Sequence, residues 1–340
     1  MKLKKGYILI GEIMNLVFDN FTEAYIGLAK LLRDEYEYEA SPRGKKVKES
    51  LGVRFEITNP LDRIPYIPAR KFSMQYVIAE SLWYLSGNNE TSWIANYAPF
   101  WNNITDDGKT ANSAYGARLF KENNKIAGGR INQWEYIKEE LKNDPDSRRA
   151  VMHIRVPDDS IDAKLDVPCT LALQFFIRDG KLNLMVNMRS SDLILGIAYD
   201  IPAFTLFQEL MATELGIGLG RYIHVSNSLH VYEQHFDMLD RIANSTLVGK
   251  VIHSRRGPVE PIPGKIDISG LFEFEKRIRA CKSYGELDKI ILDDTFTFSN
   301  YERDWALILA AHQAKKIGEK GYCRELMKTV SKQLRPIREI

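Results

Sequence analysis

Cys169 is the side chain of this sequence best suited to act as a nucleophile. It follows Pro168 and opens a β-prone run, a position that favours a thiol at a strand end beside a cleft. A thiolate is the strongest ordinary side-chain nucleophile, and nearby arginines would lower the pKa of the thiol and increase its ionised fraction at neutral pH. The alternative is a buried structural thiol, the commoner use of a free cysteine.

Arginines suited to phosphate lie on both sides of this cysteine. Arg148 and Arg149 precede it, and Arg189 with Ser190 ends the second β-prone run that follows it. The planar guanidinium group matches phosphate oxygens with two parallel hydrogen bonds. Taken alone, the Arg148-Arg149 pair is more typical of a solvated surface.

These residues need a sheet and flanking helices to bring them together. Asn20 is placed to cap a first helix and Gly87 to end a second, and Asp179-Gly180 predicts a hairpin. From apolar spacing we expect helices at 20–39, 72–85, 132–142, 201–215 and 231–242, a mainly helical stretch at 267–334, and strands at 53–57, 169–177, 182–189 and 222–230. Helices around a mixed sheet indicate an α+β or α/β fold.

Composition excludes several other classes of protein. The 340 residues carry 47 Lys+Arg against 45 Asp+Glu, which lacks the basic excess typical of nucleic-acid binding. Three cysteines at irregular spacing fit neither a disulfide framework nor a zinc cluster. No apolar run reaches ~18 residues, and the start of the chain lacks a signal-peptide core. We therefore expect a folded cytoplasmic protein with no membrane span, no metal and no nucleic-acid partner.

The motifs around Cys169 resemble those of the thymidylate synthase family. The family pattern of Asp-x-x-Ser-Arg-Arg, Pro-Cys, Gln-Phe, Arg-Ser-x-Asp, Leu-Gly and His-x-Tyr is met in order between 144 and 232. Upstream matches are Glu80–Leu85, Trp101 and Asn112–Gly116, so the resemblance covers about 20–245. It implies an α+β, thymidylate synthase-like catalytic domain over 1–250, with a large mixed β-sheet flanked by helices, and a homodimer. Residues 251–340 are expected to form a mainly helical C-terminal extension.

The resemblance also implies the chemistry. Family members bind a pyrimidine nucleoside monophosphate and 5,10-methylenetetrahydrofolate, and build a one-carbon group onto C5 of the base. Cys169 would add to C6, Asp200 would protonate N3 of cytosine, and Glu80 with Tyr115 would assist proton transfer. Glu80 could instead be a helix carboxylate paired with a neighbour, although an unpaired carboxylate in an apolar helix is costly, and Tyr115 could be a plain core aromatic.

Further residues match ligand-binding positions of the family. For the nucleotide these are Arg43, Arg189 and Ser190 on the phosphate, Arg148 and Arg149 on the phosphate in the partner subunit, His230 and Tyr232 on the sugar 3′-hydroxyl, and Asp192 and Asp200. For folate they are Asp192, Leu195 and Gly196 around the pteridine, Trp101 and Tyr199 as stacking walls, and Arg70 or Lys71 at the glutamate tail. His230 and Tyr232 could alternatively mark a polar sheet edge.

Asp200 separates two activities within the family. Thymidylate synthases carry Asn here, and the chain looks closest to phage-type deoxycytidylate hydroxymethylases. A carboxyl group accepts from the exocyclic amine of cytosine and can share a proton with N3, whereas an ionised carboxylate would face uracil O4 acceptor against acceptor. Asp200 could instead cap a helix that begins near Ile201.

The expected reaction is therefore conversion of dCMP to 5-hydroxymethyl-dCMP. The alternatives are dCMP methylation or thymidylate synthesis from dUMP, both forming dihydrofolate. A more distant alternative is a non-catalytic nucleotide- or nucleic-acid-binding relative, whose basic clusters would be 43–46, 253–256 and 315–335.

Three departures from the family pattern qualify this expectation. Thr170 replaces the histidine common after the nucleophile, and Ser226-Asn227-Ser228 replaces Gly-Gly-Asp. The chain beyond about 250 does not match the family's short tail, whose closure over folate excludes water and favours hydride transfer. That section is expected to be either a helical cover on the folate side or a dimer extension.

Overall fold

A computed structural model describes residues 16–124, 129–161, 164–245, 259, 261–332 and 334–335, with no side chains described in 122–131. The first ten residues, the basic cluster 253–256 and the chain end 336–340 lie outside these residues.

A mixed eight-stranded sheet organises the structure. Its strands are β1 (Leu16–Phe18), β2 (Tyr38–Ala40), β3 (Val47–Ile57), β6 (Val151–His153), β7 (Thr170–Arg178), β8 (Lys181–Met188), β9 (Ser191–Asp192) and β10 (Gly218–Tyr232). The strand order is β1-β3-β10-β8-β7-β6, while β2 pairs with β3 and β9 with β10. The central strand β10 runs antiparallel to β3 and parallel to β8. A separate hairpin joins β4 (Glu122–Asn124) and β5 (Gly129–Ile131).

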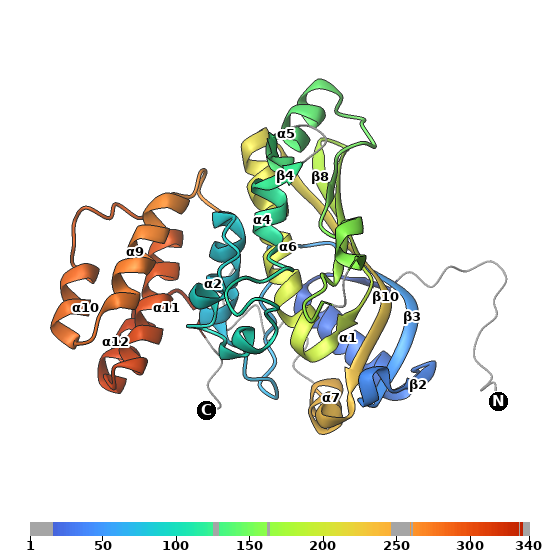
Figure 1. The fold of residues 1–340 in the computed structure, drawn as a ribbon, viewed down its shortest axis with the longest axis horizontal. Coiled ribbons are helices and arrows are strands. Elements are labelled where there is room, and N and C mark those ends of the chain that lie inside the picture. The colour runs from blue at the N-terminus through green and yellow to red at the C-terminus, as the bar shows by residue number, and fades with distance from the viewer. Residues whose placement is uncertain are drawn as a thin grey trace.

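Helices cover one side of this sheet and continue beyond it (Figure 1). They are α1 (Phe21–Asp34), α2 (Met74–Ser86), α3 (Thr91–Ile94), α4 (Tyr115–Phe120), α5 (Gln133–Asn143), α6 (Ala198–Leu215), α7 (Phe236–Ala243), α9 (Ile268–Ala280), α10 (Tyr284–Ile291), α11 (Asn300–Lys316) and α12 (Lys320–Thr329). The group α9–α12 lies beyond α2, on the side away from the sheet. The predicted α+β class, with a large mixed sheet, flanking helices and C-terminal helices, is confirmed.

Local sequence signals place several element ends correctly. The Asn20 side chain accepts a hydrogen bond from the Glu23 amide at 3.0 Å and so caps α1. Gly87, with φ 61°, ends α2 in the left-handed conformation that glycine adopts without strain. Asp179 and Gly180 both have positive φ, at 51° and 68°, which is the geometry of a two-residue hairpin turn.

Several predicted boundaries are wrong, chiefly because of strand pairing. The strand predicted at 53–57 begins at Val47 and the strand predicted at 222–230 begins at Gly218, since pairing extends both. The first helix ends at Asp34 rather than near 39, since 38–40 pair with β3. The helix predicted from Ile201 begins at Ala198, directly after a π-helical turn at Leu193–Ile197. The helix predicted from Val231 begins at Phe236, because β10 continues to Tyr232 beside the start of β3.

Helix α6 is the central helix of the core. The stretch Leu193–Leu215 is long and apolar enough to cross a membrane, but 78% of that window is buried inside the protein, as expected for a core helix. The Gln208 side chain donates to the carbonyl of Leu182 in β8 at 2.8 Å, which fixes the helix over the sheet. The first turn of α6, with Asp200, is thereby held over the sheet.

The C-terminal helices pack against α2 and the segment that follows it. Tyr97 donates to Glu275 of α9 at 2.8 Å. His312 of α11 donates from Nε2 to the carbonyl of Asn96 at 3.1 Å. These helices therefore support the part of the chain that leads from α2 to Trp101.

Candidate active site

Cys169 lies immediately before β7, with the guanidinium of Arg189 beside it. Arg189 Nη2 is 3.6 Å from Sγ, and its Nε and Nη2 donate to the carbonyls of Pro168 and Val167 at 2.9 and 2.8 Å. Burial raises the pKa of the thiol, while Arg189 and, less strongly, Arg43 oppose that rise. The arginines act on this pKa in the predicted direction, but burial outweighs them, so the pKa of the thiol is raised in the free protein.

Glu80 is buried on α2 and makes no ion pair with any residue that the structure describes. It is 6% exposed, and its Oε1 accepts a hydrogen bond from Tyr76 at 2.6 Å. Tyr76 in turn accepts one from the Trp101 indole at 3.0 Å. Burial raises the pKa of Glu80 to about 8, and the charge of Asp200 adds to the rise. Its carboxyl can therefore hold or release a proton near neutral pH.

Tyr76, which links Trp101 to Glu80 by hydrogen bonds, was not predicted from the sequence. It lies four residues before Glu80, on the same face of α2, and this spacing was the available signal. Its partner Trp101 packs edge-on against Trp83 at 5.1 Å. Trp101 thus orients Tyr76 through its N–H, in addition to the stacking role that the resemblance implies.

Tyr115 opens α4 and is stacked between two core rings. Its ring centroid lies 5.1 Å from that of Tyr84 and 6.0 Å from that of Phe204. Burial raises its pKa well above the usual value, and the charges of Asp200 and Cys169 raise it further. Electrostatic coupling thus connects Tyr115 with the other three predicted catalytic residues.

Asp200 lies in the first turn of α6 and does not cap it. The helix starts at Ala198, and the preceding Ile197 offers no side-chain cap. In the described part of the chain no hydrogen bond or ion pair satisfies the Asp200 carboxyl. Burial raises its pKa to about 7, with a further contribution from Asp192. A side chain at Gly196 would approach Asp200 Oδ2 to 3.2 Å, so this glycine keeps space beside the carboxyl.

Asp192 has one oxygen in use and one free. Its Oδ1 accepts from the amides of Ile194 and Leu195 at 2.7 and 3.1 Å. Its Oδ2 is buried, and no residue in the described ranges donates to it. A buried carboxylate oxygen without a partner is costly, so it fits a ligand that supplies N–H donors, as a pteridine ring does.

An aromatic wall stands next to this carboxylate. The Tyr199 ring stacks on Phe72 at 5.2 Å and meets Tyr76 edge-on at 4.8 Å. Arg70 lies over Phe72 and Tyr199, with Nη2 donating to the carbonyl of Ile194 at 2.8 Å. The surroundings of Asp192 therefore fit a flat, hydrogen-bonding ring such as that of folate, and Leu195, which is 56% exposed, borders them.

His230 and Tyr232 lie at the end of the central strand β10. His230 is flanked by β3 and β9, so it does not lie at a sheet edge, whereas Tyr232 pairs with β3 alone. His230 is opposite Asp192 in the β9–β10 register. The His230 and Tyr232 rings meet edge-on at 5.3 Å. The predicted sugar-binding and folate-binding residues are thus adjacent.

The remaining predicted phosphate ligands are on the surface or half-buried. Ser190 is half-buried beside Arg189, while Arg43 and Arg148 are exposed. Arg149 is 74% exposed at its side chain and pairs with Glu140 of α5 at 3.0 Å. Within the described residues of one chain, Arg148 and Arg149 make no contact with Cys169 or Arg189.

His224 is a buried polar residue whose environment the sequence did not predict. Its Nδ1 lies 3.0 Å from the Tyr222 hydroxyl and its Nε2 lies 3.3 Å from Ser191 Oγ. Burial lowers its pKa to about 3, so the imidazole is neutral at physiological pH. Across the described ranges, no group of three or more His, Cys, Asp or Glu residues is placed to hold a metal ion.

Comparison with known proteins follows the same stretch of chain. A family model described as thymidylate synthase matches residues 23–248. The chain is 36% identical over 218 residues to a deoxyuridylate hydroxymethyltransferase of Bacillus phage SP01, covering 62% of this chain and 57% of that protein. It is 30% identical over 210 residues to a thymidylate synthase of Bacillus phage phi3T, covering 61% of this chain and 74% of that protein. For thymidylate synthase 1 of Bacillus subtilis strain 168 the identity is 29% over the same length and coverage. The match thus spans little more than half of the phage hydroxymethyltransferase.

Proposed function

Since this chain belongs to the thymidylate synthase family, we propose that it transfers a one-carbon unit from 5,10-methylenetetrahydrofolate to C5 of dCMP. The product is 5-hydroxymethyl-dCMP: water supplies the hydroxyl group, and tetrahydrofolate leaves without being oxidised. The observation that carries the choice of base is the half-buried carboxyl of Asp200, which has no hydrogen bond or ion pair among the described residues and whose pKa of about 7 lets it hold a proton at neutral pH.

Asp200 supplies what a cytosine ring needs for activation. Cytosine N3 carries no proton, and the ring accepts an electron pair at C6 only if N3 is protonated as the pair arrives. A protonated Asp200 donates that proton and accepts from the 4-amino group. An asparagine at this position has no acidic proton to give.

The other residues of the cluster divide the remaining work. The Cys169 thiolate adds to C6, which makes C5 a carbanion equivalent, and Arg189 stabilises the thiolate. Bound folate supplies the one-carbon unit at the methylene level of oxidation. Glu80, held by Tyr76, accepts the C5 proton, and Tyr115 assists from its place beside Cys169 and Asp200. Elimination of Cys169 then restores the ring.

A second candidate is hydroxymethylation of dUMP. It is favoured by the printed activity of the phage SP01 relative and by the ability of a protonated Asp200 to donate to O4 and accept from N3–H. The two candidates differ in what they require of residue 200, because uracil already carries its N3 proton.

We extend the proposal to a homodimer with shared sites. The exposed Arg148 and Arg149 are then free to reach the phosphate bound by a partner. Because strand side chains alternate, the half-buried apolar residues Phe176 and Met185 lie on the face opposite the fully buried Phe175 and Leu184, and they suit an interface. Mixing inactive Arg149→Ala and Cys169→Ser subunits should restore part of the activity, and no recovery would argue for self-contained sites.

In this proposal residues 1–250 form the catalytic domain and 251–340 the extension. The position of the family match at 23–248 supports that division. The proposal takes water, rather than hydride, to complete the reaction.

Asp200→Asn tests the proposed base. We expect kcat/KM for dCMP to fall by about 100-fold, while that for dUMP is unchanged or rises, because only cytosine requires the acid. Asp192→Asn is the matched control, since it changes the neighbouring carboxylate at the folate site and should weaken both substrates equally. An unchanged dCMP-to-dUMP ratio in Asp200→Asn would overturn the assignment to cytosine.

A further inference from the structure

In the segment 166–169, which ends at Cys169, every backbone carbonyl accepts a hydrogen bond. The carbonyl of Asp166 accepts from Asn112 Nδ2 at 2.9 Å. Arg189 supplies the other three bonds, from Nη2 to Val167, from Nε to Pro168 and from its backbone amide to Cys169. Residues 166–169 are therefore held from one side by Arg189 and from the other by Asn112.

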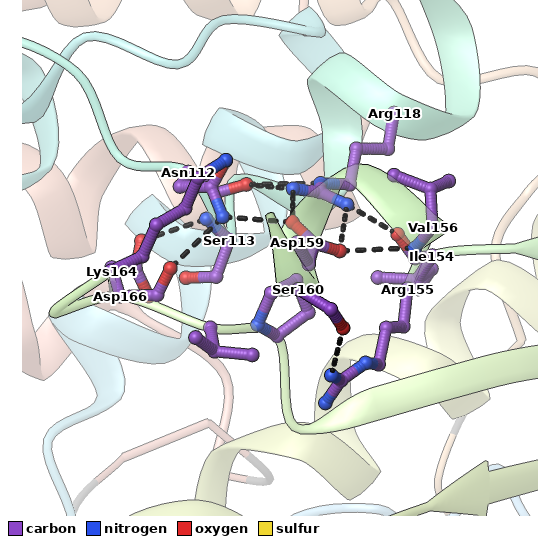
Figure 2. Close-up of polar contacts among 12 residues, drawn as sticks. Asn112, Ser113, Arg118, Ile154, Arg155, Val156, Asp159, Ser160, Lys164 and Asp166 are labelled. Carbon is purple, nitrogen blue, oxygen red and sulfur yellow. Dashed lines mark hydrogen bonds and ion pairs between the residues drawn. The ribbon is translucent and has the colours of Figure 1, made fainter. Parts of the chain in front are cut away.

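The Asp166 side chain joins this segment to the start of α4. Its Oδ2 accepts from the backbone amide of Ser113 at 2.7 Å (Figure 2). Ser113 lies two residues before Tyr115, and Asp166 lies three residues before Cys169. Asp166 and Ser113 are 6% and 8% exposed, so water competes little for this bond. The bond thus connects the two loops that carry the nucleophile and the tyrosine.

An ion pair between Arg118 and Asp159 holds Asn112, which binds the carbonyl of Asp166. Arg118 of α4 donates from Nη1 and Nη2 to the two carboxylate oxygens of Asp159 at 2.8 and 2.7 Å, and from Nε to the carbonyl of Asn112 at 2.9 Å. Asn112 also donates to Asp159 at 2.9 Å, as Figure 2 shows. This geometry fixes Asn112, and through it the 166–169 segment.

We propose that Asp166 is a positioning residue for catalysis, which holds Cys169 at its place relative to Tyr115 through Ser113, with Arg118 and Asp159 as its support. The inference rests on the proposed function in that Cys169 is taken as the nucleophile. Any side-chain acceptor at position 166 could bind the Ser113 amide, but a carboxylate also places a negative charge near the thiol of Cys169.

That charge gives the proposal a separate electrostatic consequence. Asp166 is among the groups that raise the pKa of Cys169, acting against Arg189. Because the charge and the hydrogen bond belong to the same side chain, two substitutions separate them. Asn retains an acceptor oxygen for the Ser113 amide and removes the charge, while Ala removes both.

The experiment measures alkylation of Cys169 by iodoacetamide as a function of pH, together with kcat and KM. It uses the full chain with Cys281→Ser and Cys323→Ser, so that one thiol reacts. Asp166→Asn should move the alkylation midpoint to lower pH, with about three- to tenfold faster reaction below the midpoint, and should keep kcat within a few-fold of wild type. Asp166→Ala should lower kcat by about 10- to 100-fold, with a smaller change in nucleotide KM, because the nucleophile is misplaced.

Arg155→Ala is the control on the same loop. Its Nη2 donates to Ser160 at 2.9 Å in an exposed contact outside the buried junction, so kcat and the alkylation profile should remain those of wild type. A higher kcat in Asp166→Asn than in Asp166→Ala would identify loss of the hydrogen bond to Ser113 as the cause of the lower activity.

A folded Asp166→Ala protein with normal kcat would overturn the positioning role, and an alkylation profile for Asp166→Asn that coincides with wild type would overturn the electrostatic role. If Asp166→Ala fails to fold, Asp166→Ser is measured in its place, with the same expected loss of kcat. Alkylation needs neither nucleotide nor folate, so it is independent of the substrate assignment. Turnover by Cys169→Ser would refute the covalent mechanism and leave the alkylation result standing.

Discussion

Buried carboxyl groups occur in two regions of the molecule, the sheet region of 16–245 and the C-terminal helices of 261–335, but their surroundings differ. In the C-terminal helices, Glu275 accepts from Tyr97 and pairs with Arg279 at 3.0 Å. Glu302 accepts from the amides of Asp267 and Ser299 and so completes a helix cap. Both carboxylates have the partners that structural roles require.

Two of the predicted catalytic residues, Glu80 and Asp200, are carboxyls without such partners. Glu80 interacts with the hydroxyl groups of Tyr76 and Tyr84 but with no cationic side chain in the described ranges, where Asp200 has no hydrogen bond or ion pair. Their pKa values rise to about 8 and about 7 because burial is not offset. Groups held in this way suit proton transfer rather than folding. The contrast separates a region that performs chemistry from one that supports it.

Exchange of a thiol in each region gives the largest contrast. Cys169→Ser should lower turnover by at least ~10⁴-fold with nucleotide binding retained, because the nucleophile is lost. Cys281→Ser removes a buried thiol of the C-terminal helices and should leave turnover within about twofold of wild type. Steady-state kinetics and nucleotide titration measure both, and normal turnover in Cys169→Ser would end the distinction.

Removal of a buried arginine in each region should differ in stability. Arg118→Ala leaves Asp159, whose side chain is 1% exposed, without its ion-pair partner, and should lower the free energy of unfolding by about 3–5 kcal/mol. Arg279 is 31% exposed, and Tyr97 still donates to Glu275 without it, so Arg279→Ala should cost about 1–2 kcal/mol. Urea unfolding compares them, and equal losses would contradict the prediction.

The pH dependence of kcat/KM should reveal the unpaired carboxyl. Activity rises with pH as Cys169 ionises, but a carboxyl with a raised pKa keeps its proton below about pH 7 and loses it above. Turnover of dCMP by the wild type should therefore level off above about pH 7. The profile of Asp200→Asn with dUMP should continue to rise, and identical profiles would show that residue 200 exchanges no proton in the reaction.

The smallest effect is expected where the two regions meet. Tyr97→Phe removes the hydrogen bond to Glu275 and should lower the free energy of unfolding by about 1 kcal/mol, with a few-fold rise in the KM for folate. The KM changes because the 93–101 segment carries Trp101. Tyr284→Phe, on the exposed helix α10, is the control and should change neither quantity. A folate KM unaffected by Tyr97→Phe would confine the C-terminal helices to stability.

Much of this arrangement was predictable from local sequence. The order of motifs from Glu80 to Tyr232 predicted the fold, and Gly87 and the Asp179-Gly180 turn predicted element ends, because glycine conformations and hairpin turns depend on adjacent residues. The end of the first helix was not predictable, since the strand at 38–40 forms only through pairing with the distant β3.

The electrostatics of the site depended on burial, which sequence does not supply. Arg189 predicted a lowered pKa for Cys169, but the cost of burying the thiolate is larger. Tyr76 and Glu80 are four residues apart on α2, but the hydrogen bond from Trp101 to Tyr76 spans 25 residues, and no helical spacing predicts it. The resemblance supplied which residues meet, and the structure supplied their charges and partners.

The most direct test of the central claim is a mass-resolved product assay with the purified protein, methylenetetrahydrofolate, and dCMP, CMP or dUMP in turn. We predict a product from dCMP that is heavier by one CH₂O unit, with tetrahydrofolate released. A product heavier by one CH₂ unit, with dihydrofolate formed, or reaction with dUMP alone, would contradict the assignment as a deoxycytidylate hydroxymethylase.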